Sequence, residues 1–373
     1  MKERHLHIVA HDVPWPADYG GVIDNYYKIK WLHRFGIKIH LHCFVKNRPP
    51  QKVLEKYCEA VHYYKRKGIR SISLALPYII SSRSNNELLQ NLLKDNYPIS
   101  FEGIHGTYPL FNNKLKDRKI FIRILNAEFI YYKELAANET NLFKKIYYQN
   151  ESRLLKNYEA NISHKAHLLP LSIQDEKIFA EIFKVSQINF LPASLPWDNV
   201  FFNEGKGSYC LYHGNLSVNE NEKAAQWLVE NVFKESGIPF VIAGRSPRMQ
   251  LKSLVKKYDH IQLKENPSDS EMQQLIENAQ INVLPSFNKT GLKLKLLNAL
   301  FNGRYCVVNA AGCEGSGTAE LCHTAETPED FKNQIEKLWK ELFTKTTMQH
   351  RSTALKNLYN NEENARRLIA WIW

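Results

Sequence analysis

The sequence predicts an α/β protein with two Rossmann-like, doubly wound domains that face each other across a cleft. Three observations lead to this prediction. The chain has 373 residues, more than one ordinary hydrophobic core accommodates. Strand-like and helix-like segments alternate along it, which is typical of parallel sheets. The alternation is interrupted once, over 190–208, by a segment that contains two prolines and two glycines, and then begins again.

The first half opens with a βαβ unit. The apolar run 5–11 predicts a strand, and a turn rich in proline and glycine follows it. A helical pattern from Val22 to Phe35 ends at Gly36, and 38–45 predicts a second, parallel strand. The remaining elements expected in this half are strands at 59–65, 99–106, 119–125 and 167–172, and a long amphipathic helix at 138–164.

The second half repeats the alternation. We expect strands at 209–214, 239–244, 260–265, 280–285 and 305–309, and helices at 220–233, 248–257, from Ser268, from about Leu292 to Asn302, at 328–343 and at 352–372. These elements predict an N-terminal domain (1–195), a C-terminal domain (196–355) and a C-terminal helix (356–373) that packs back on the N-terminal domain.

Composition limits the class of protein. The chain is 44% hydrophobic and 12% aromatic, which favours a globular fold, and it has no apolar run of the roughly 20 residues that span a bilayer. We therefore expect a cytoplasmic location. The six cysteines show neither a metal-binding spacing nor a disulfide framework, so no metal site is expected. Most of the net charge of +12 lies in the first 200 residues, where cations alternate with tyrosines. This basic half could bind an anionic membrane surface, nucleic acid or an acidic substrate. The alternative is a solvated surface that binds no partner.

The segment "FNKTGLKLKLLNALFNG" (287–303) is the most informative. It follows a predicted strand, so its helix begins at the carboxyl edge of the sheet, where ligands bind. Lys293 and Lys295 occupy the first turn, a place that disfavours cations unless an anion is bound there. Backbone amides and two ammonium groups together form a receptor for a diphosphate, with Asn298 beside it. The alternative is that both lysines extend into solvent from a helix whose leucines are core.

These residues resemble a known family. The stretch "KTGLKLKLLNALFNGRYCVVNAAGCEGSG" looks like the donor-binding segment of retaining, GT-B-fold, nucleotide-sugar glycosyltransferases (glycosyltransferase family 4, group 1 type). The stretches "PWPADYGGVIDNYYKIKWLHRFGIKIHL", "RILNAEFIYYKELA" and "YHGNLSVNENEKAAQWLVENVF" are similar to other segments of the same family. The resemblance covers nearly the whole chain in order, and it is the combination of segments that is specific.

The resemblance and the local patterns together assign candidate residues. The catalytic candidates are His105, Arg245 and Lys295, of which the cations would stabilise a leaving diphosphate. The donor-binding candidates are Gly20, Gly21, Gly214, Lys293, Lys295, Asn298 and Glu314. The acceptor-binding candidates are Asp18, Asp24, Arg123, Asn126 and Glu128. For Arg245, a surface arginine with no role in catalysis is an equally good interpretation. For His105, a solvent-facing loop histidine is an equally good interpretation.

Four positions depart from the family pattern. Asn298 stands where a carboxylate usually contacts the donor ribose, and Thr290 stands at the partner acidic position. Leu125 replaces the histidine of the "RILNAE" stretch, and Asn215 replaces an arginine common after the first glycine of the donor domain. These departures bear on donor affinity.

The resemblance implies a retaining hexosyltransferase that needs no metal or other cofactor, in which the domain at 1–195 binds the acceptor and the domain at 196–355 binds the donor. It would move a sugar from a nucleotide diphosphate donor to a glycan or lipid-linked acceptor, in polysaccharide biosynthesis, with a peripheral contact between the N-terminal domain and an anionic membrane. One alternative is a catalytically weak or silent GT-B protein that binds a sugar nucleotide or a partner enzyme. Another is a basic polynucleotide-binding protein, although the sequence contains no nucleic-acid-binding motif, and we expect no nucleic acid partner.

Overall fold

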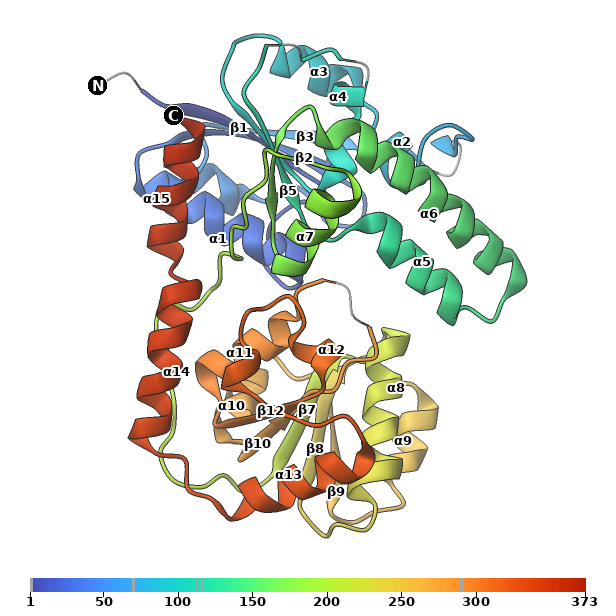
Figure 1. The fold of residues 1–373 in the computed structure, drawn as a ribbon, viewed down its shortest axis with the longest axis vertical. Helices are drawn as coiled ribbons and strands as arrows, with labels where there is room; N and C mark the ends of the chain where they lie inside the picture. The colour runs from blue at the N-terminus through green and yellow to red at the C-terminus, as the bar shows by residue number, and fades with distance from the viewer. Residues whose placement is uncertain (1–2, 69–70, 112, 116, 289–290) are drawn as a thin grey trace. The chain divides into compact units, whose positions relative to one another are not determined.

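A computed structural model of the chain describes residues 3–68, 71–111, 113–115, 117–288 and 291–373. The chain divides into two compact units (Figure 1). The first unit comprises Met1–Pro196, Thr290–Leu292 and Tyr359–Trp373, and the second comprises Trp197–Lys289 and Lys293–Leu358. Each unit contains one six-stranded parallel sheet with helices around it, which confirms the predicted fold class of two Rossmann-like domains.

The sheet of the first unit has the strand order β3-β2-β1-β4-β5-β6. Its strands are β1 (His5–Ala10), β2 (Lys38–Val45), β3 (Ala60–Lys65), β4 (Ile99–Glu102), β5 (Ile120–Ile124) and β6 (His167–Pro170). The helices of this unit are α1 (Gly20–Arg34), α2 (Tyr78–Ser81), α3 (Asn86–Leu92), α4 (Tyr108–Phe111), α5 (Glu128–Asn138), α6 (Leu142–Ser163), α7 (Ile173–Ile182) and α15 (Asn361–Ile372). The described part of this unit also contains the 3-10 turns Lys52–Lys56 and Ile104–Gly106.

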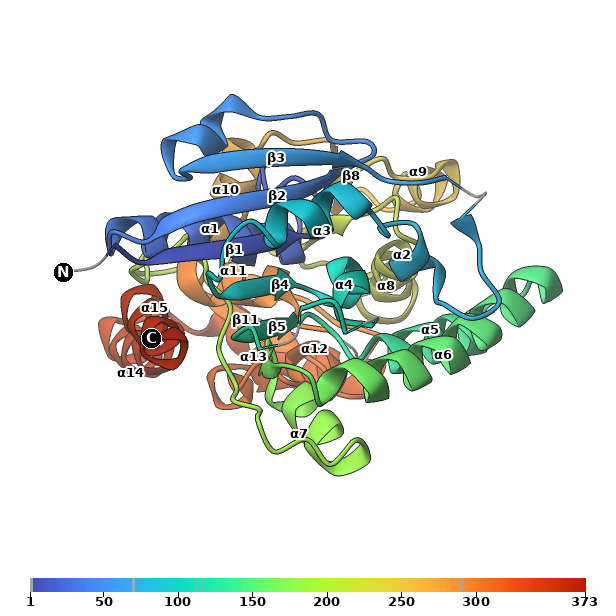
Figure 2. The same cartoon turned by 90° about the horizontal axis from the view of Figure 1, so that it is seen from above.

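Alternation along the strands builds a separate core on each face of this sheet. Leu6 and Ile8 of β1 share a core with α1 and α15, whereas Val9 lies in the core shared with α3 and α6. Leu368 and Ile372 of α15 belong to the first of these cores, so the C-terminal helix packs on the N-terminal unit (Figures 1 and 2). Among the described residues, no helix is both long enough and apolar enough to cross a bilayer.

The second unit has the strand order β12-β11-β10-β7-β8-β9. Its strands are β7 (Cys210–Asn215), β8 (Phe240–Arg245), β9 (Ile261–Glu265), β10 (Ile281–Val283), β11 (Tyr305–Val308) and β12 (His323–Thr324). Its helices are α8 (Asn219–Leu228), α9 (Met249–Val255), α10 (Asp269–Asn278), α11 (Leu294–Asn302), α12 (Ala310–Cys313), α13 (Pro328–Lys340) and α14 (Lys345–Leu358), with a π turn at Val229–Phe233 and a 3-10 turn at Ala319–Leu321.

Two long helices predicted from the sequence have other boundaries in the structure, because a helix break falls inside each predicted range. The helix expected at 138–164 begins at Leu142, and the preceding residues form α5, which we did not predict as a helix. Asn141 causes this division because its side chain accepts the Lys144 amide and caps α6. The helix expected at 352–372 is likewise divided into α14 and α15, where Asn360 caps the second helix through the Glu363 amide.

Five histidines occupy one face of the three strands β1, β2 and β3. His7 and His42 are buried in this row, and His42 stacks on His62 with ring centroids 5.0 Å apart. Nδ1 of His5 lies 3.0 Å from Nε2 of His40. Side chains of one face of a parallel sheet recur at every second residue, which explains the spacing of His5 and His7 and of His40 and His42.

Candidate functional site

The carboxyl edge of the second sheet places Lys295 beside β7 and α8. Lys293 is the N-cap residue of α11, so Lys295 lies in its first turn, as the sequence predicts. The Lys295 ammonium lies 4.8 Å from the centre of the Tyr212 ring, 3.4 Å from the Tyr212 hydroxyl and 3.3 Å from Oδ1 of Asn221. The Tyr212 hydroxyl donates to the backbone carbonyl of Asn221 and so fixes the ring. Three elements therefore hold one half-buried cation.

The electrostatics of Lys295 are those of a cation held among neutral groups. Burial lowers the pKa of Lys295 to about 8; the charge of Lys293 adds to this effect, and Glu220 opposes it. His213, next to Tyr212 in β7, is buried, and Nε2 of its ring has no hydrogen-bond partner among the residues that the structure describes. Burial lowers the pKa of His213 to about 3, and Lys295 contributes to the shift, so this imidazole is neutral. An anion bound here would favour the charged form of Lys295.

A glycine that the sequence analysis did not single out shapes the same edge. A Cβ atom on Gly244, at the end of β8, would lie 2.0 Å from the carbonyl oxygen of Gly214, so only glycine fits there. Gly214 itself, a predicted donor contact, has more room: its Cβ would meet Asn221 at 3.4 Å. The close approach of the ends of β7 and β8 thus depends on Gly244. In the sequence, the signal for this position was a glycine directly before Arg245.

Asn298 is engaged within its own helix. Its Oδ1 accepts from the side-chain amide of Asn302 at 2.8 Å, and Asn302 is buried. The two residues are four apart and so neighbours on the helix surface. Asn302 thus holds the Asn298 side chain on the surface of the helix. Thr290, the other departure from the family pattern near this site, lies outside the described residues.

The loop after β11 is organised by Asn309, which the sequence analysis did not identify. Oδ1 of Asn309 accepts the amides of Ser286 and Gly312, and its Nδ2 donates to the Ser286 carbonyl. The loops after β10 and β11 are therefore joined. Glu314 follows α12 and is half-buried, and Gly315 after it has φ of 73°, a left-handed conformation that favours glycine. An asparagine directly after a strand and before a glycine-rich turn was the available signal.

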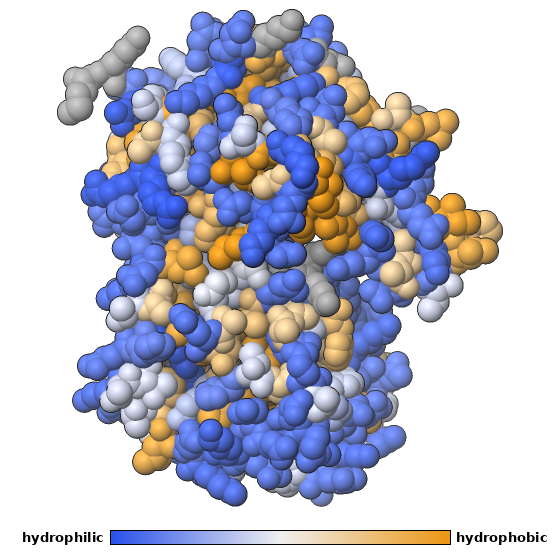
Figure 3. Space-filling view, in the orientation of Figure 1, coloured by the Kyte–Doolittle hydropathy of each residue, from blue (hydrophilic) through white to orange (hydrophobic). Residues whose placement is uncertain are grey.

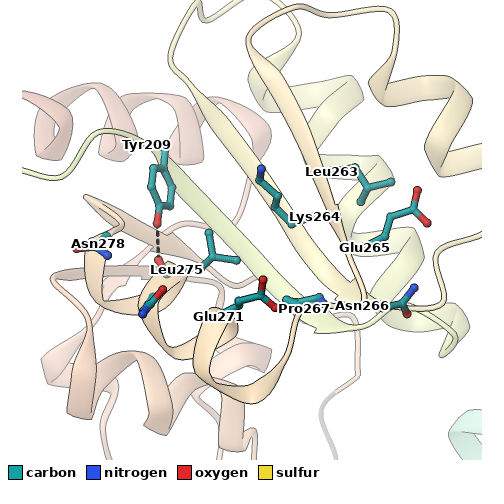
Figure 4. A pocket seen from close by; sticks show the side chains of 10 residues that line it. Tyr209, Leu263, Lys264, Glu265, Asn266, Pro267, Glu271, Leu275 and Asn278 are labelled. Carbon is teal, nitrogen blue, oxygen red and sulfur yellow. Dashed lines mark hydrogen bonds between the residues drawn. The ribbon is translucent and has the colours of Figure 1, made fainter.

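Arg245 extends into solvent. Its side chain is 54% exposed and forms an ion pair of 3.4 Å with Asp269, which is itself 94% exposed. A cavity of about 660 Å³ lies nearby between β9 and α10, lined by residues such as Tyr209, Lys264 and Glu271 (Figure 4). None of the predicted site residues lines this cavity. The chemistry of Lys295 is therefore separate from the cavity that Figure 4 shows.

In the first unit, Asp24 and Arg123 have a structural role in place of the predicted acceptor binding. Both side chains are 1% exposed. Nε and Nη2 of Arg123 donate to the two Asp24 oxygens at 2.9 and 3.1 Å, and the Ser194 amide and Lys28 also donate to Asp24. These cations lower the pKa of Asp24 despite its burial, so the carboxylate stays charged. Every Asp24 oxygen is thus occupied, and the network joins α1, β5 and the segment that leaves the unit.

His105 lies at the carboxyl edge of the first sheet, near His11. The two ring centroids are 5.2 Å apart, and Nδ1 of His105 is buried without a hydrogen-bond partner among the described residues. Nδ1 of His11 donates to the Glu102 carbonyl at 3.2 Å, and Nε2 of His11 lies 3.3 Å from the Tyr19 hydroxyl, which donates to Asp12 at 3.0 Å. Burial lowers the pKa of His105 well below its ordinary value, with Arg83 contributing, so the ring is neutral.

The predicted glycine pair opens α1 beside these histidines. Helix α1 begins at Gly20, and a Cβ on Gly21 would lie 2.8 Å from Cε1 of His11 and 3.2 Å from Leu125. Gly21 is therefore needed for close packing against His11. Asp18, just before the glycines, is held by Arg48 at 2.7 Å. The structure brings Gly21, His105 and His11 together at one edge of the sheet.

Asn126 and Glu128 stand at the start of α5 with two further carboxylates. Nδ2 of Asn126 lies 3.5 Å from Glu128, and Glu159 accepts the Glu128 and Phe129 amides at 2.9 and 3.0 Å. Burial raises the pKa of Glu128 to about 7, and Asp175 adds to the increase. Glu128 can therefore hold a proton near neutral pH. In the described part of the chain, no group of three or more His, Cys, Asp or Glu residues is arranged to bind a metal ion.

Comparisons with known proteins extend over the whole chain. Residues 207–341 match the family described as glycosyl transferases group 1. An uncharacterized 44.6 kDa protein in the cps region of Klebsiella pneumoniae is 30% identical over 333 residues, which are 83% of this chain and 84% of that protein.

Solved structures share the fold. TarM has a TM-score of 0.70 at 11% identity, covering 100% of this chain and 99% of its own. A variant of S. aureus TarM in complex with Fondaparinux, alpha-GlcNAc-glycerol and UDP has a TM-score of 0.68 at 10% identity, covering 99% of each chain. Acinetobacter baumannii MurG has a TM-score of 0.54 at 13% identity, again covering 99% of each chain.

Proposed function

Because this chain belongs to the same family as the Klebsiella cps-region protein and is a GT-B glycosyltransferase with a group 1 domain, we propose that it is a retaining hexosyltransferase. It takes the sugar from a nucleotide diphosphate donor and passes it to a glycan or lipid-linked acceptor, without a metal or other cofactor. The observation that carries the proposal is the half-buried Lys295 ammonium in the first turn of α11, whose contacts are the neutral Tyr212 and Asn221.

Donor binding follows from the charges at that helix. A helix N-terminus carries about half a positive charge, and two lysines beside it repel each other until an anion arrives. Lys293 lowers the pKa of Lys295, which is the physical sign of that repulsion. A diphosphate would take hydrogen bonds from the backbone amides of α11 and an ion pair from each ammonium group. We assign Lys293, Lys295, Gly214, Asn298 and Glu314 to the donor.

The chemical step requires the diphosphate to leave the anomeric carbon with its electron pair. Preorganised positive charge at the leaving group is commonly the largest catalytic contribution in such a reaction. Lys295 supplies that charge with little reorganisation, because the Tyr212 ring and Asn221 already hold it in place. Arg245 retains a proposed role at the leaving group, and its exposure leaves its side chain able to move toward a bound donor.

The first unit supplies the proposed acceptor side. His105 is neutral and its ring is half-buried, so we propose that the ring forms a hydrogen bond with a sugar hydroxyl. Gly20 and Gly21, which the sequence analysis assigns to the donor, open α1 next to it. Glu128 holds or releases a proton near neutral pH and, with Asn126 and Asp18, completes the acceptor contacts that we propose.

The acceptor class is proposed from the relatives. The Klebsiella protein is described by its place in a cps region, and the S. aureus TarM complex contains a sugar-bearing glycerol and UDP. A glycan or lipid-linked acceptor for polysaccharide biosynthesis is consistent with both. We propose a cytoplasmic protein that contacts an anionic membrane through its first unit, since the basic half of the sequence lies there.

The test is a panel of nucleotides and nucleotide sugars. UDP, GDP and their sugars are titrated against the purified chain by thermal shift, and the stabilising donors are incubated with candidate acceptors and followed by mass spectrometry. We expect stabilisation by one nucleotide diphosphate and an anomeric configuration in the product, read by NMR, that matches the donor. If a nucleotide stabilises the protein but neither product nor slow donor hydrolysis is detected, the catalytically silent alternative described below is favoured. If no nucleotide stabilises the protein, both the transferase and the silent alternative are refuted.

One observation favours a catalytically weak or silent GT-B protein as the second candidate. The family pattern places a carboxylate at position 298, and here the amide oxygen of Asn298 is already used by Asn302. The donor ribose would then lose a charge-assisted hydrogen bond, which is stronger than a bond to an amide. A protein of this kind would bind a sugar nucleotide or a partner enzyme without turnover.

A further inference from the structure

Helices α5 and α6 form a hairpin that extends away from the sheet of the first unit. The two helices lie side by side in both views and reach well beyond the strands (Figures 1 and 2). The start of α6 exposes four large apolar side chains in succession on the helix: Leu142 (66% exposed), Phe143 (83%), Ile146 (55%) and Tyr147 (37%). Residues spaced by one, four and five positions share one side of a helix. They form a continuous apolar stripe, which we call the hairpin tip.

A second apolar projection lies on the same side of this unit. Ile72 and Leu74, between β3 and α2, are 55% and 92% exposed. This loop leads into α2, which is tied to α6: the Tyr78 amide donates to Glu151 at 2.8 Å, and Arg66 lies 5.5 Å from the centre of the Tyr78 ring. Figure 3 shows two hydrophobic patches at that edge of the molecule, one over this loop and one over the hairpin tip. Large exposed apolar groups gathered in this way mark an interaction surface.

Cations surround the hairpin tip. A groove of about 530 Å³ runs between α5 and α6, and its lining combines Phe129, Ala136 and Ala137 with four cations: Lys133, Lys145, Arg153 and Lys156. Lys144 lies exposed within the tip itself. On the same hairpin, Glu151 and Glu159 point inward and accept backbone amides, so their charges are taken up inside the unit. No carboxylate is among the described residues that line the groove, so the groove beside the tip is both apolar and positive.

We infer that the hairpin tip and the groove beside it dock the first unit on a bilayer that contains anionic phospholipid. The apolar stripe enters the interface between headgroups and acyl chains, and the groove cations contact lipid phosphates. Aliphatic side chains such as Leu142 and Leu74 gain nothing from a nucleic acid backbone, whereas a bilayer buries them. A second copy of the chain in a two-fold pair would set Lys144 and Lys145 against the same two lysines. This inference deepens the membrane contact in the proposed function by naming its surface.

Vesicle flotation of the full chain tests this inference without any sugar nucleotide. Vesicles of phosphatidylcholine alone are compared with vesicles in which about a third of the lipid is phosphatidylglycerol, the anionic component that attracts polybasic surfaces. We expect binding to the anionic vesicles that weakens as salt is raised. The double variant Leu142→Ser with Phe143→Ser should reduce this binding at least about tenfold, because the inserted apolar area is lost. The double variant Lys145→Gln with Arg153→Gln should reduce it about fivefold for each cation and lower the salt dependence.

The matched control removes equally exposed apolar groups from the second unit. Met249 and Leu342 are 71% and 63% exposed there, and Met249→Ser with Leu342→Ser should leave flotation unchanged. All variants should keep the wild-type melting temperature and UDP affinity, measured without vesicles, so that failure of docking is distinguished from failure of the proposed transferase. The inference is overturned if the wild type does not float with anionic vesicles, if the control loses as much binding as the tip variant, or if the tip residues instead hold a dimer that the tip variant dissociates.

Discussion

Nδ1 of His7 lies 2.9 Å from Nε2 of His42 in the row of histidines that crosses β1 and β2. The hydrogen bonds around this pair run in one direction. Nε2 of His7 donates to Asp95 at 3.0 Å, so Nδ1 of His7 accepts from Nε2 of His42. Nδ1 of His42 then accepts from the Tyr64 hydroxyl at 2.8 Å. The Tyr64 hydroxyl in turn accepts from the side-chain amide of Asn91. Each ring has one proton, and its neighbours fix which nitrogen carries it.

This arrangement predicts that acid weakens the first unit. Burial lowers the pKa of His7 to about 4 and that of His42 to about 2, below the ordinary value of 6.5. Because the folded values are depressed, the stabilisation is complete above pH 6.5 and declines as the pH falls from 6.5 toward the folded values, by about 1.4 kcal/mol per histidine and pH unit. Chemical denaturation between pH 8 and about 4.5 measures this slope. His42→Gln should flatten it, and His33→Gln, at an exposed position, should not; equal slopes in all three proteins would contradict the prediction.

Removal of the Lys295 ammonium should weaken nucleotide binding. Lys295→Ala should raise the dissociation constant of the nucleotide diphosphate by the equivalent of about 1.5 to 3 kcal/mol, the range for hydrogen bonds to charged groups. Titration calorimetry measures this change. Lys264→Ala is a suitable control because Lys264 lies in β9, by the separate cavity of Figure 4. An unchanged dissociation constant in Lys295→Ala would exclude Lys295 from the site.

The pH dependence of donor affinity should follow the same side chain. The pKa of Lys295 is lowered to about 8, so the ammonium is charged below pH 8 and is lost as the pH rises through that value. Donor affinity should therefore be constant between pH 6.5 and 7.5 and fall above pH 8. Lys295→Arg keeps its charge throughout this range, so its affinity should not fall. A wild-type affinity that is flat up to pH 9.5 would argue against an ion pair between Lys295 and the diphosphate.

A carboxylate at position 298 should strengthen donor binding. Asn298→Glu should tighten the binding of the nucleotide sugar by about 1 kcal/mol, because a hydrogen bond between a ribose hydroxyl and a carboxylate is stronger than one to an amide. Asn302 can still donate to the new side chain, so the helix keeps its local pair. Weaker binding in Asn298→Glu would show that the pocket is built around the amide.

Asp24 distinguishes a structural carboxylate from an acceptor contact. Asp24→Asn leaves the Arg123 guanidinium buried without a counter-charge and should reduce the free energy of unfolding by about 3 to 5 kcal/mol. Asp18→Asn, at an exposed ion pair with Arg48, should change it by less than about 1 kcal/mol. If Asp24→Asn instead keeps wild-type stability and raises only the KM for acceptor, the acceptor role returns.

Local sequence signals predicted most of the fold. The glycine that ends α1, the capping pattern at Ser268 and the strand before α11 are short-range features, and they placed Lys293 and Lys295 correctly at the start of a helix. The division of the long helices was missed because the apolar period continues across Asn141 and Asn360, and the side-chain caps that interrupt it are weak signals.

The candidate site was less predictable because its contacts join distant residues. Arg123 meets Asp24 across 99 positions, and nothing in either local sequence shows that the pair is buried. The clearance at Gly244 depends on the carbonyl of Gly214 in another strand. Asn298 and Asn302, by contrast, are helix neighbours, so their pairing was readable from the sequence once the helix was assigned.

The return of α15 to the first unit has a consequence for biosynthesis. Leu368 and Ile372 cover apolar side chains of β1 and α1, yet the ribosome makes them only after the whole second unit. Until then, α1 covers this face of the earliest strand without α15, and the part of the core that Leu368 and Ile372 fill stays exposed to other nascent chains. The second unit is one continuous stretch of sequence apart from three residues, so all of its core residues are made before α15. We therefore expect the second unit to finish folding before the first, although it is translated later.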